Sequence, residues 1–432
     1  MKFKNIITKI TLSVLILTTF STCSFAGTKE NIQELDSNVQ SEAAVIIEET
    51  TGKVIYNKNA YEKYYPASTT KIMTAILAIE QCNLDEMATA SEYAITSIPS
   101  GYTDANIQIG ESLSVKDLLY ATMLKSANEA AVILAEHVSG SVEAFSDLMN
   151  KKAEEIGCKN THFVNPNGIH DEDHYSTAYD MALIAQYCMK NETFRKIAAT
   201  TSYTLPATNR YETNDRTFLN TNELVIKNTN AREDNYYYPY ATGIKTGYTT
   251  PAGNCLISSA EKNGMKFITV VFGALVTDEG LSQRYLNTIA MFEFAFNNYS
   301  FQKVKDQGNL IDTVEIENGT DDTKKLEIGI DKEIVALTSL DVDITNLKGE
   351  IDLNDDLKAP IKKGDKVGTI TYEIEGLTYT ADLIANSDVK KKTSAELIIW
   401  TTLIILLLII GFLYFNKRNK RYRRRKNYYV NF

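Results

Sequence analysis

The pattern of apolar and polar positions predicts a block of helices that lies, along the chain, between two groups of strands. Strand-like runs are short, alternating or continuously apolar, and bounded by turn residues. They are found at residues 43–47, 53–56, 242–249, 255–259 and 266–275. Asn263-Gly264, between the last two runs, is a strong signal for a two-residue hairpin. We therefore expect strands from both groups to pair in one antiparallel sheet.

Between these groups, apolar positions recur with the spacing of helices. The expected helices begin at Ser68 and at Ser114, and cover 129–138, 181–189 and 281–298. Ser114 is a typical N-cap for a helix that continues to about Lys125. Residues 151–180 are rich in Gly, Pro, Asn and Asp, and are therefore expected to form mainly a long loop.

The composition changes after Tyr299. Residues 300–384 alternate as strands do and contain turn signals such as Asn318-Gly319, so they are expected to form a small all-β domain. A polar linker is expected at 385–396. Residues 397–415 are apolar and uncharged, and are long enough to cross a bilayer as one transmembrane helix.

The two ends of the chain predict its cellular location. Residues 1–26 combine lysines, an apolar run and a small-residue end, which is the order of a signal peptide; an uncleaved anchor is the alternative. The tail at 416–432 is strongly basic and is expected in the cytoplasm by the positive-inside rule. Between a polar leader at 27–40 and the β domain, residues 41–299 form the expected catalytic domain. It is therefore expected outside the cell, tethered to the membrane.

Charge and cysteine spacing exclude several classes of protein. The net charge is −10 although both ends are basic, so the exported body is more acidic than the whole chain and nucleic acid is not an expected partner. The cysteines after the predicted signal are Cys82, Cys158, Cys188 and Cys255. They form no CxxC pair, so their spacing indicates neither a zinc site nor a disulfide framework.

Ser68 and Lys71, in Tyr65-Pro66-Ala67-Ser68-Thr69-Thr70-Lys71, are the most informative residues. They lie one helical turn apart on one face of the expected helix. A lysine that is buried there has a lowered pKa and can accept the serine proton, which activates the hydroxyl without a histidine. A capping serine beside a solvated lysine is the alternative for this pair alone.

Two further motifs follow. Ser126-Ala127-Asn128 lies at the expected corner between two helices, where a hydroxyl can relay a proton and an amide can hold a carbonyl group or the lysine. Helix capping is the alternative. Lys245-Thr246-Gly247 lies on an expected strand, whose glycine lets another backbone approach closely. That suits a peptide lying along the strand with its carboxylate at the lysine and threonine; an exposed edge lysine is the alternative.

In this order, the three motifs resemble those of the serine D-alanyl-D-alanine carboxypeptidases, the low-molecular-mass penicillin-binding proteins. The resemblance covers about residues 38–298 and includes Asn165-Pro166-Asn167-Gly168 and the segments 176–182 and 243–249. It implies an α/β fold, mixed α and antiparallel sheet, similar to serine β-lactamases and penicillin-binding proteins. The β segment resembles the C-terminal domain of the same group more loosely.

The resemblance also implies residue roles. The implied catalytic residues are Ser68, Lys71, Ser126 and Asn128, and the implied substrate-binding residues are Lys245, Thr246, Gly247, Tyr248 and Thr249. Ser68 would be the acylated nucleophile and Lys71 its base, and the backbone N–H groups of Ser68 and Tyr248 would form the oxyanion hole. Many relatives have histidine where Tyr248 stands, which puts details of substrate preference or deacylation in question.

The implied activity is removal of the terminal D-alanine from the stem pentapeptides of peptidoglycan through an acyl-enzyme, without cofactor or metal. β-Lactams would be covalent inhibitors. A membrane-tethered penicillin-binding sensor without peptidase activity, or a D,D-endopeptidase, is the alternative within the same family.

Other enzyme classes fit less well. A class A β-lactamase needs a glutamate-bearing deacylation segment, which is not evident before Lys245. The pair His170 and His174 has a spacing of four but lies in an expected solvated loop without HExxH, so it does not predict a metal site. A GxSxG frame is absent, and His137 and His162 are expected to have structural or surface roles.

Overall fold

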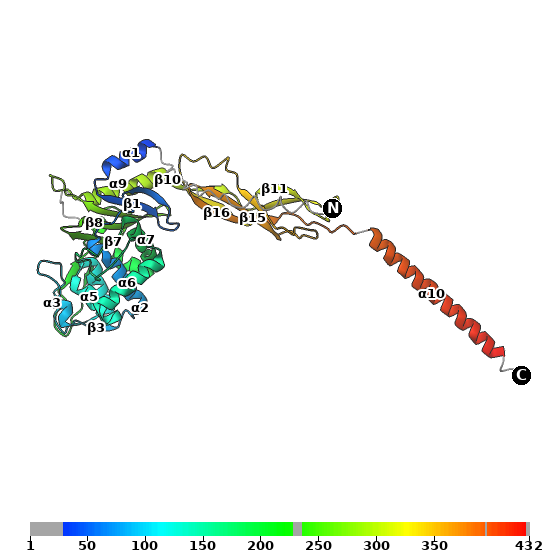
Figure 1. Ribbon diagram of the computed structural model, residues 1–432, viewed down its shortest axis with the longest axis horizontal. Helices are drawn as coiled ribbons and strands as arrows, with labels where there is room; N and C mark the ends of the chain where they lie inside the picture. Colours follow the sequence, from blue (N-terminus) through cyan, green and yellow to red (C-terminus); the bar gives the residue numbers. More distant parts are fainter. Residues whose placement is uncertain (1–28, 228–235, 394, 429–432) are drawn as a thin grey trace, which may run out of the picture. The chain divides into compact units, whose positions relative to one another are not determined.

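The computed structural model describes residues 29–227, 236–393 and 395–428. The predicted signal peptide, residues 1–26, lies outside the described residues. Contacts divide the chain into two units (Figure 1): residues up to Phe301 together with Leu337–Val342 form the first, and Gln302–Ala336 together with the chain from Asp343 form the second.

The first unit is built on a five-stranded antiparallel sheet in the order β2-β1-β9-β8-β7. Its strands are β1 (Ala43–Glu48), β2 (Val54–Lys58), β7 (Ala241–Thr249), β8 (Gly253–Lys262) and β9 (Met265–Ala274). Strands from the two ends of the domain meet where Val45 of β1 faces Val270 of β9. The expected antiparallel sheet is therefore confirmed, and β7 is one of its edges.

Both faces of this sheet are covered, because β1 buries all six of its residues. Val45 and Ile47 belong to an apolar cluster shared with the helical block, whereas Ala44 and Ile46 belong to a second cluster shared with α9 (Gln283–Asn298). Figure 1 shows α9 on one side of the sheet and the helical block on the other.

The helical block contains α2 (Lys71–Gln81), α3 (Glu92–Thr96), α4 (Val115–Tyr120), α5 (Asn128–Ser139), α6 (Val142–Ile156), α7 (Ala178–Met189) and α8 (Glu192–Ala199). The short strands β3 (Met87–Thr89), β4 (Ser112–Ser114), β5 (Ser202–Thr204) and β6 (Thr217–Leu219) form two further ladders. Ser114 caps α4, as expected, with its hydroxyl accepting the N–H of Asp117. The chain continues to Lys125 as a turn of π-helix rather than α-helix.

Two expectations about loops are wrong. Residues 151–156 form the last part of α6, whose apolar face carries Phe145, Met149 and Ala153 into the core. The leader was expected to be loose, but α1 (Lys29–Asn38) lies within it. Leu35 and Val39 are buried in the cluster beneath α9, and their apolar contacts stabilise the segment.

The second unit contains a five-stranded antiparallel sheet in the order β11-β12-β16-β15-β14 around its own apolar core. Its strands are β11 (Leu310–Glu315), β12 (Lys325–Ile330), β14 (Glu350–Leu353), β15 (Lys366–Ile374) and β16 (Leu377–Ala385). Strands β10 (Tyr299–Lys305) and β13 (Ile334–Ser339) form a separate pair. The all-β character expected after Tyr299 is confirmed.

The chain ends in α10 (Ala395–Tyr428), which contains a stretch, Ile398–Arg421, that is long and apolar enough to cross a membrane. The expected transmembrane residues 397–415 lie almost wholly within this stretch. Its side chains from Ile398 to Arg421 are exposed in the isolated chain, as a helix surrounded by lipid requires.

Candidate active site

Ser68 lies in a short 3-10 turn, Ala67–Thr70, that leads directly into α2, whose first residue is Lys71. The serine is half-buried, and Lys71 is completely buried. The helix that follows has buried residues at every position from Lys71 to Ala78, so the packing around α2 fixes the lysine beneath the serine.

The Lys71 ammonium group is held by three acceptors. Its Nζ lies 3.0 Å from Ser68 Oγ, 2.9 Å from Asn128 Oδ1 and 2.6 Å from the carbonyl oxygen of Asn167. A neutral amine has two N–H groups and one lone pair. It can donate to the amide and carbonyl oxygens and still accept the serine proton. The geometry therefore suits a lysine that acts as a base.

Burial, followed by the charge of Lys245, lowers the pKa of Lys71 well below its ordinary value, and Glu129 acts in the opposite direction. Burial disfavours the charged form of an amine, and a neighbouring cation does the same. These effects favour the neutral form of Lys71, which is the form that acts as a base.

Ser126 and Asn128 stand at the corner between the π-helical turn and α5, as expected. Ser126 has a left-handed backbone (φ 64°), and this turns the chain sharply before α5 begins at Asn128. The backbone N–H and side-chain amide of Asn128 both donate to the carbonyl oxygen of Thr103, at 3.1 and 2.8 Å. Asn128 thus joins Lys71 to the loop that contains Thr103.

Strand β7 lies directly beside the turn that carries Ser68. A Cβ atom built on Gly247 would lie 3.1 Å from each of Pro66 O, Ser68 N and Thr69 N, so a larger residue would crowd this backbone. The glycine of this motif was expected to let another backbone approach closely. In the structure that backbone is the protein's own turn at Ser68. This approach brings the backbone of residues 247–248 next to the N–H of Ser68.

Lys245, the lysine of the third motif, is buried more deeply than expected for a residue that contacts the substrate carboxylate. Lys245 is completely buried, and its Nζ donates to the carbonyl oxygen of Thr246 at 3.0 Å. Burial and the charge of Arg284 lower the pKa of Lys245 to about 7. The positive charge of Lys245 lowers the pKa of Lys71 from a position beneath the cleft.

These residues surround a cleft of about 450 Å³. Of the nine predicted site residues, those that line it directly are Ser68, Ser126, Asn128, Thr246, Gly247, Tyr248 and Thr249. Lys71 lies beneath Ser68 at hydrogen-bond distance, and Lys245 adjoins Thr246 on β7. Tyr248 is 60% exposed, so its ring is free to contact a bound molecule.

Several residues of the cleft were not predicted. The lining also includes Ser100, Gly101, Tyr102, Thr103, Gly168, Ile169, Thr221, Thr250 and Arg284. Arg284 lies near the start of α9, and its Nε is buried without a hydrogen-bond partner among the described residues. An arginine that lines a cleft is suited to binding a carboxylate. The sequence around Arg284 contains no motif that would single it out.

Gly168 supports the nucleophile turn from the other side. A Cβ atom there would lie 1.9 Å from the carbonyl oxygen of Ala67, and its φ is +76°. The preceding residue, Asn167, supplies the carbonyl oxygen that Lys71 contacts. The segment Asn165-Pro166-Asn167-Gly168 was noted in the sequence only as a resemblance, and the structure assigns it this contact with the turn.

The expected solvated loop is found at residues 171–173, which are exposed, but His174 departs from it. This side chain is 2% exposed and lies behind the nucleophile turn. The N–H of Val164 donates to its Nδ1 at 3.1 Å, so Nε2 carries the proton and donates to Thr70 Oγ1 at 2.8 Å. Burial lowers its pKa to about 3, so the ring is neutral. With both nitrogens engaged, His174 is not positioned to bind a metal together with His170.

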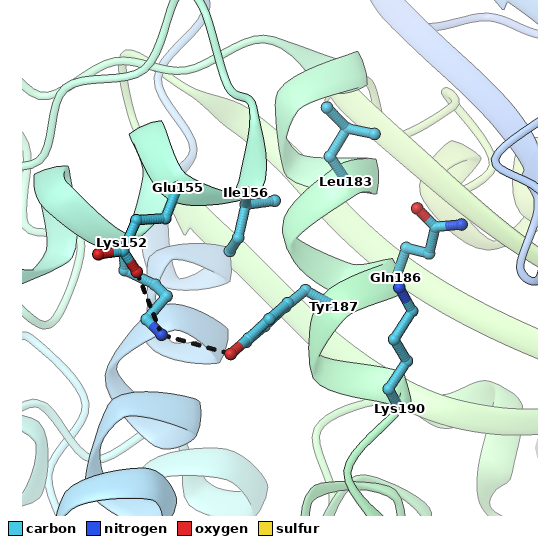
Figure 2. Close-up of a pocket in the computed structure, with 7 residues that line it drawn as sticks. All are labelled: Lys152, Glu155, Ile156, Leu183, Gln186, Tyr187 and Lys190. Carbon is cyan, nitrogen blue, oxygen red and sulfur yellow. Dashed lines mark hydrogen bonds and ion pairs between the residues drawn. The ribbon is translucent and has the colours of Figure 1, made fainter.

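A second hollow lies between α6 and α7 (Figure 2). Its volume is about 210 Å³, and Lys152 and Tyr187 are prominent in its lining. The lysine Nζ lies 2.9 Å from a carboxylate oxygen of Glu80 and 3.6 Å from one of Glu155. The charge of Lys152 is therefore already balanced by these carboxylates. Ser68, the expected nucleophile, lines the other cleft.

Comparison with known proteins agrees with this geometry. Residues 28–275 match the family described as D-alanyl-D-alanine carboxypeptidase, and residues 299–391 match the C-terminal domain of penicillin-binding protein 5. The chain belongs to the D-alanyl-D-alanine carboxypeptidase family. The chain is 35% identical to D-alanyl-D-alanine carboxypeptidase DacF of Bacillus subtilis, over 90% of this chain and 95% of that relative.

Solved structures of the family have the same fold. Penicillin-binding protein 5 of Haemophilus influenzae is 27% identical, with a TM-score of 0.61 over 82% of this chain and 98% of that one. The D-alanyl-D-alanine carboxypeptidase DacD of Francisella tularensis is 27% identical, with a TM-score of 0.59 over 82% and 94%. The expected α/β fold with an added β domain is confirmed.

Proposed function

We propose that this protein is a serine carboxypeptidase that removes the terminal D-alanine from peptidoglycan stem peptides through an acyl-enzyme on Ser68. The observation that carries the proposal is the buried Lys71 amine, 3.0 Å from the Ser68 hydroxyl at the floor of the cleft. Family membership supports the reaction class, and the named relatives support the D-alanyl-D-alanine substrate.

The first half-reaction uses Lys71 as a base. The neutral amine accepts the proton of the Ser68 hydroxyl while the serine oxygen forms a bond to the carbonyl carbon of the last peptide link. The developing oxyanion is stabilised by the backbone N–H groups of Ser68 and Tyr248, which the close approach of Gly247 brings together.

Collapse of this intermediate breaks the C–N bond. The amine of the departing D-alanine takes a proton that Lys71 received, with Ser126 as the relay between them. Water then attacks the ester on Ser68, with the same lysine as base, and releases the shortened stem. The chemistry needs protonatable side chains and backbone donors, all of which the cleft supplies.

The D-alanine carboxylate is held, in this proposal, by Thr246, Thr249 and Arg284. All three line the cleft on the β7 side. Thr246 Oγ1 donates to Thr221 Oγ1 at 2.7 Å, and its proton would turn from Thr221 to the carboxylate when the peptide binds. Arg284 supplies the positive charge at the cleft surface, and the buried Lys245 supplies a second charge beneath it.

We propose that α10 anchors the protein to a membrane and that the catalytic unit lies outside the cell. The basic residues that follow the apolar stretch support a cytoplasmic tail. Protease treatment of intact cells tests this: the catalytic unit should be cleaved while a tag fused after Phe432 stays protected. A protected catalytic unit would contradict the orientation.

The proposed nucleophile is tested by labelling with a fluorescent penicillin and by measuring D-alanine release from a stem pentapeptide. Ser68→Ala should lose both activities, whereas the control Ser100→Ala, at an exposed serine of the same cleft, should retain them. Labelling that survives Ser68→Ala would remove Ser68 from this role. Penicillin labelling of the wild-type protein without D-alanine release would favour a sensor instead of a peptidase.

A further inference from the structure

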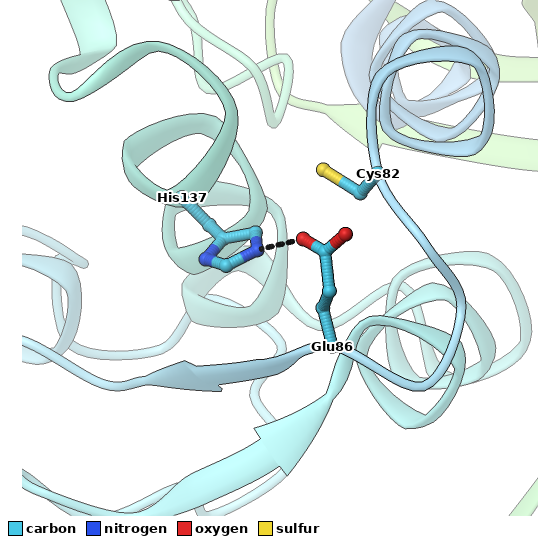
Figure 3. Close-up of side chains that lie close together, drawn as sticks. All are labelled: Cys82, Glu86 and His137. Carbon is cyan, nitrogen blue, oxygen red and sulfur yellow. Dashed lines mark hydrogen bonds and ion pairs between the residues drawn. The ribbon is translucent and has the colours of Figure 1, made fainter.

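Three side chains with metal-binding atoms converge near the C-terminal ends of α2 and α5, the helices whose first residues are Lys71 and Asn128 (Figure 3). They are Cys82, which follows α2, Glu86, which precedes β3, and His137, in the last turn of α5. The Sγ, carboxylate oxygen and imidazole nitrogen all lie within 4.8 Å of one another. All three side chains are at least partly accessible to solvent.

The spacing within this cluster fits a bound zinc ion. Zinc bonds to imidazole nitrogen and carboxylate oxygen are about 2.0–2.2 Å long, so a tetrahedral ion holds two such atoms about 3.3 Å apart. His137 Nε2 and Glu86 Oε2 are 3.2 Å apart. A simple ion pair between His137 and Glu86 would have the same distance. The nearby thiol of Cys82 is what favours a metal site over an ion pair.

The thiol points toward the space beside the histidine and glutamate rather than away from them (Figure 3). A mixed sulfur, nitrogen and oxygen set favours zinc over magnesium or calcium, which prefer oxygen alone. Binding of the cation releases the thiol proton as the Zn–S bond forms.

The surrounding backbone already holds the ligands in place. The other oxygen of Glu86 accepts the N–H of Asn83 at 2.8 Å, which leaves Oε2 for the metal. The carbonyl group of Glu86 accepts the N–H of Val115 at 2.9 Å, so the loop is tied to the start of α4. A carboxylate oriented by such a hydrogen bond is typical of metal sites.

We propose that Cys82, Glu86 and His137 bind one zinc ion, with water at the fourth position. The ion would join the ends of two helices that both begin at the active site, since α2 starts at Lys71 and α5 starts at Asn128. Its role is to clamp these helices together, outside the catalytic chemistry.

Cobalt provides a direct test, because a Co²⁺–thiolate bond absorbs in the near ultraviolet. The protein, purified without a histidine tag and treated with EDTA, should gain this band with one equivalent of Co²⁺, and Zn²⁺ should displace it. Cys82→Ser and His137→Gln should abolish the band, and Glu86→Gln should weaken binding at least tenfold. The control His162→Gln alters another exposed histidine and should leave the band unchanged.

A second measurement uses only the wild-type protein. The cysteines Cys158, Cys188 and Cys255 are buried, so alkylation of Cys82 can be followed by mass spectrometry of its peptide. Zinc should slow alkylation of Cys82 at least tenfold and raise the midpoint of thermal unfolding. An unchanged alkylation rate, or a cobalt band that persists in Cys82→Ser, would overturn the proposal.

Discussion

At the scale of single residues, the site contains two buried lysines, and the charge of one acts on the other. Lys71 and Lys245 are both completely buried, and the charge of the second lowers the pKa of the first. Two such groups are costly to bury, and strongly perturbed pKa values of this kind are typical of functional sites.

The first prediction concerns the Lys245 charge. Lys245→Met removes a neighbouring cation, so the pKa of Lys71 should rise, and the acid limb of the acylation rate should move to higher pH. The pKa of Lys245 is about 7, so its charge is present mainly below that pH, and the difference from wild type should be largest there. The rate of penicillin labelling measured from pH 5 to about 10 checks this.

The control for this prediction is Lys116→Met, at an exposed position. It should leave the acid limb in place. Lys245→Met is also expected to weaken carboxylate binding, but that changes the height of the profile rather than the position of its limb. A limb that stays in place or moves to lower pH would contradict the coupling between the lysines.

The second prediction concerns Arg284. If its guanidinium group binds the substrate carboxylate, Arg284→Gln should raise KM for a stem pentapeptide about 10- to 100-fold, because a hydrogen bond to a charged group is lost. A stem whose terminal carboxylate is amidated should be processed equally by both proteins. An unchanged KM would place the carboxylate elsewhere in the cleft.

At the scale of elements, the turn that carries Ser68 is held between Gly247 of β7 and Gly168, which lies in the loop between α6 and α7. The turn is short, and its backbone leaves no room for a Cβ atom at Gly168 and only a tight fit at Gly247. The position of the nucleophile is thus set by two segments that are distant in sequence.

A pair of glycine variants tests this support. Gly168→Ala should push the turn away from Lys71 and reduce acylation about 100-fold, the scale expected for a misplacement of about 1 Å. Gly140→Ala places alanine at a similar φ of +80°, but with nothing within 4 Å, and should retain activity. If both variants acylate at the wild-type rate, the contact at Ala67 does not position Ser68.

The sequence predicted those elements whose apolar pattern is local. The five sheet strands and the helices after Ser68 and Asn128 are of this kind, and so is the Asn263-Gly264 hairpin, where both residues have positive φ. Helix α1 was missed because it is largely polar and is stabilised by Leu35 against a distant helix.

The parts of the site that were missed depend on tertiary contacts. Arg284 comes near β7 only when α9 packs on the sheet, and its own segment contains no signature. His174 lies among acidic residues that suggest solvent, but the ring is buried because it hydrogen-bonds to Thr70 and Val164. Local composition does not report such contacts.

At the scale of the whole molecule, the anchor and the catalytic unit have separable roles. The stretch Ile398–Arg421 is long and apolar enough to cross a membrane, and the candidate active-site residues all lie before α9 ends. Removal of the anchor should therefore change location without changing the chemistry.

Two truncated chains test this separation. A chain that ends at Thr393 should be recovered in the soluble fraction with the wild-type rate of penicillin labelling. A chain that ends at Asn416 keeps the expected transmembrane residues but lacks the basic tail, and should still sediment with membranes. Membrane recovery of the shorter chain would reveal a second attachment elsewhere.

The complete burial of α2 from Lys71 to Ala78 limits how this enzyme can evolve resistance to β-lactam drugs. A substitution that shifted this helix would also disable hydrolysis of the natural peptide. Heritable escape should instead accumulate at the rim, at Tyr102 and the exposed Tyr248, where a bulky antibiotic would make contacts that a slender stem peptide does not make.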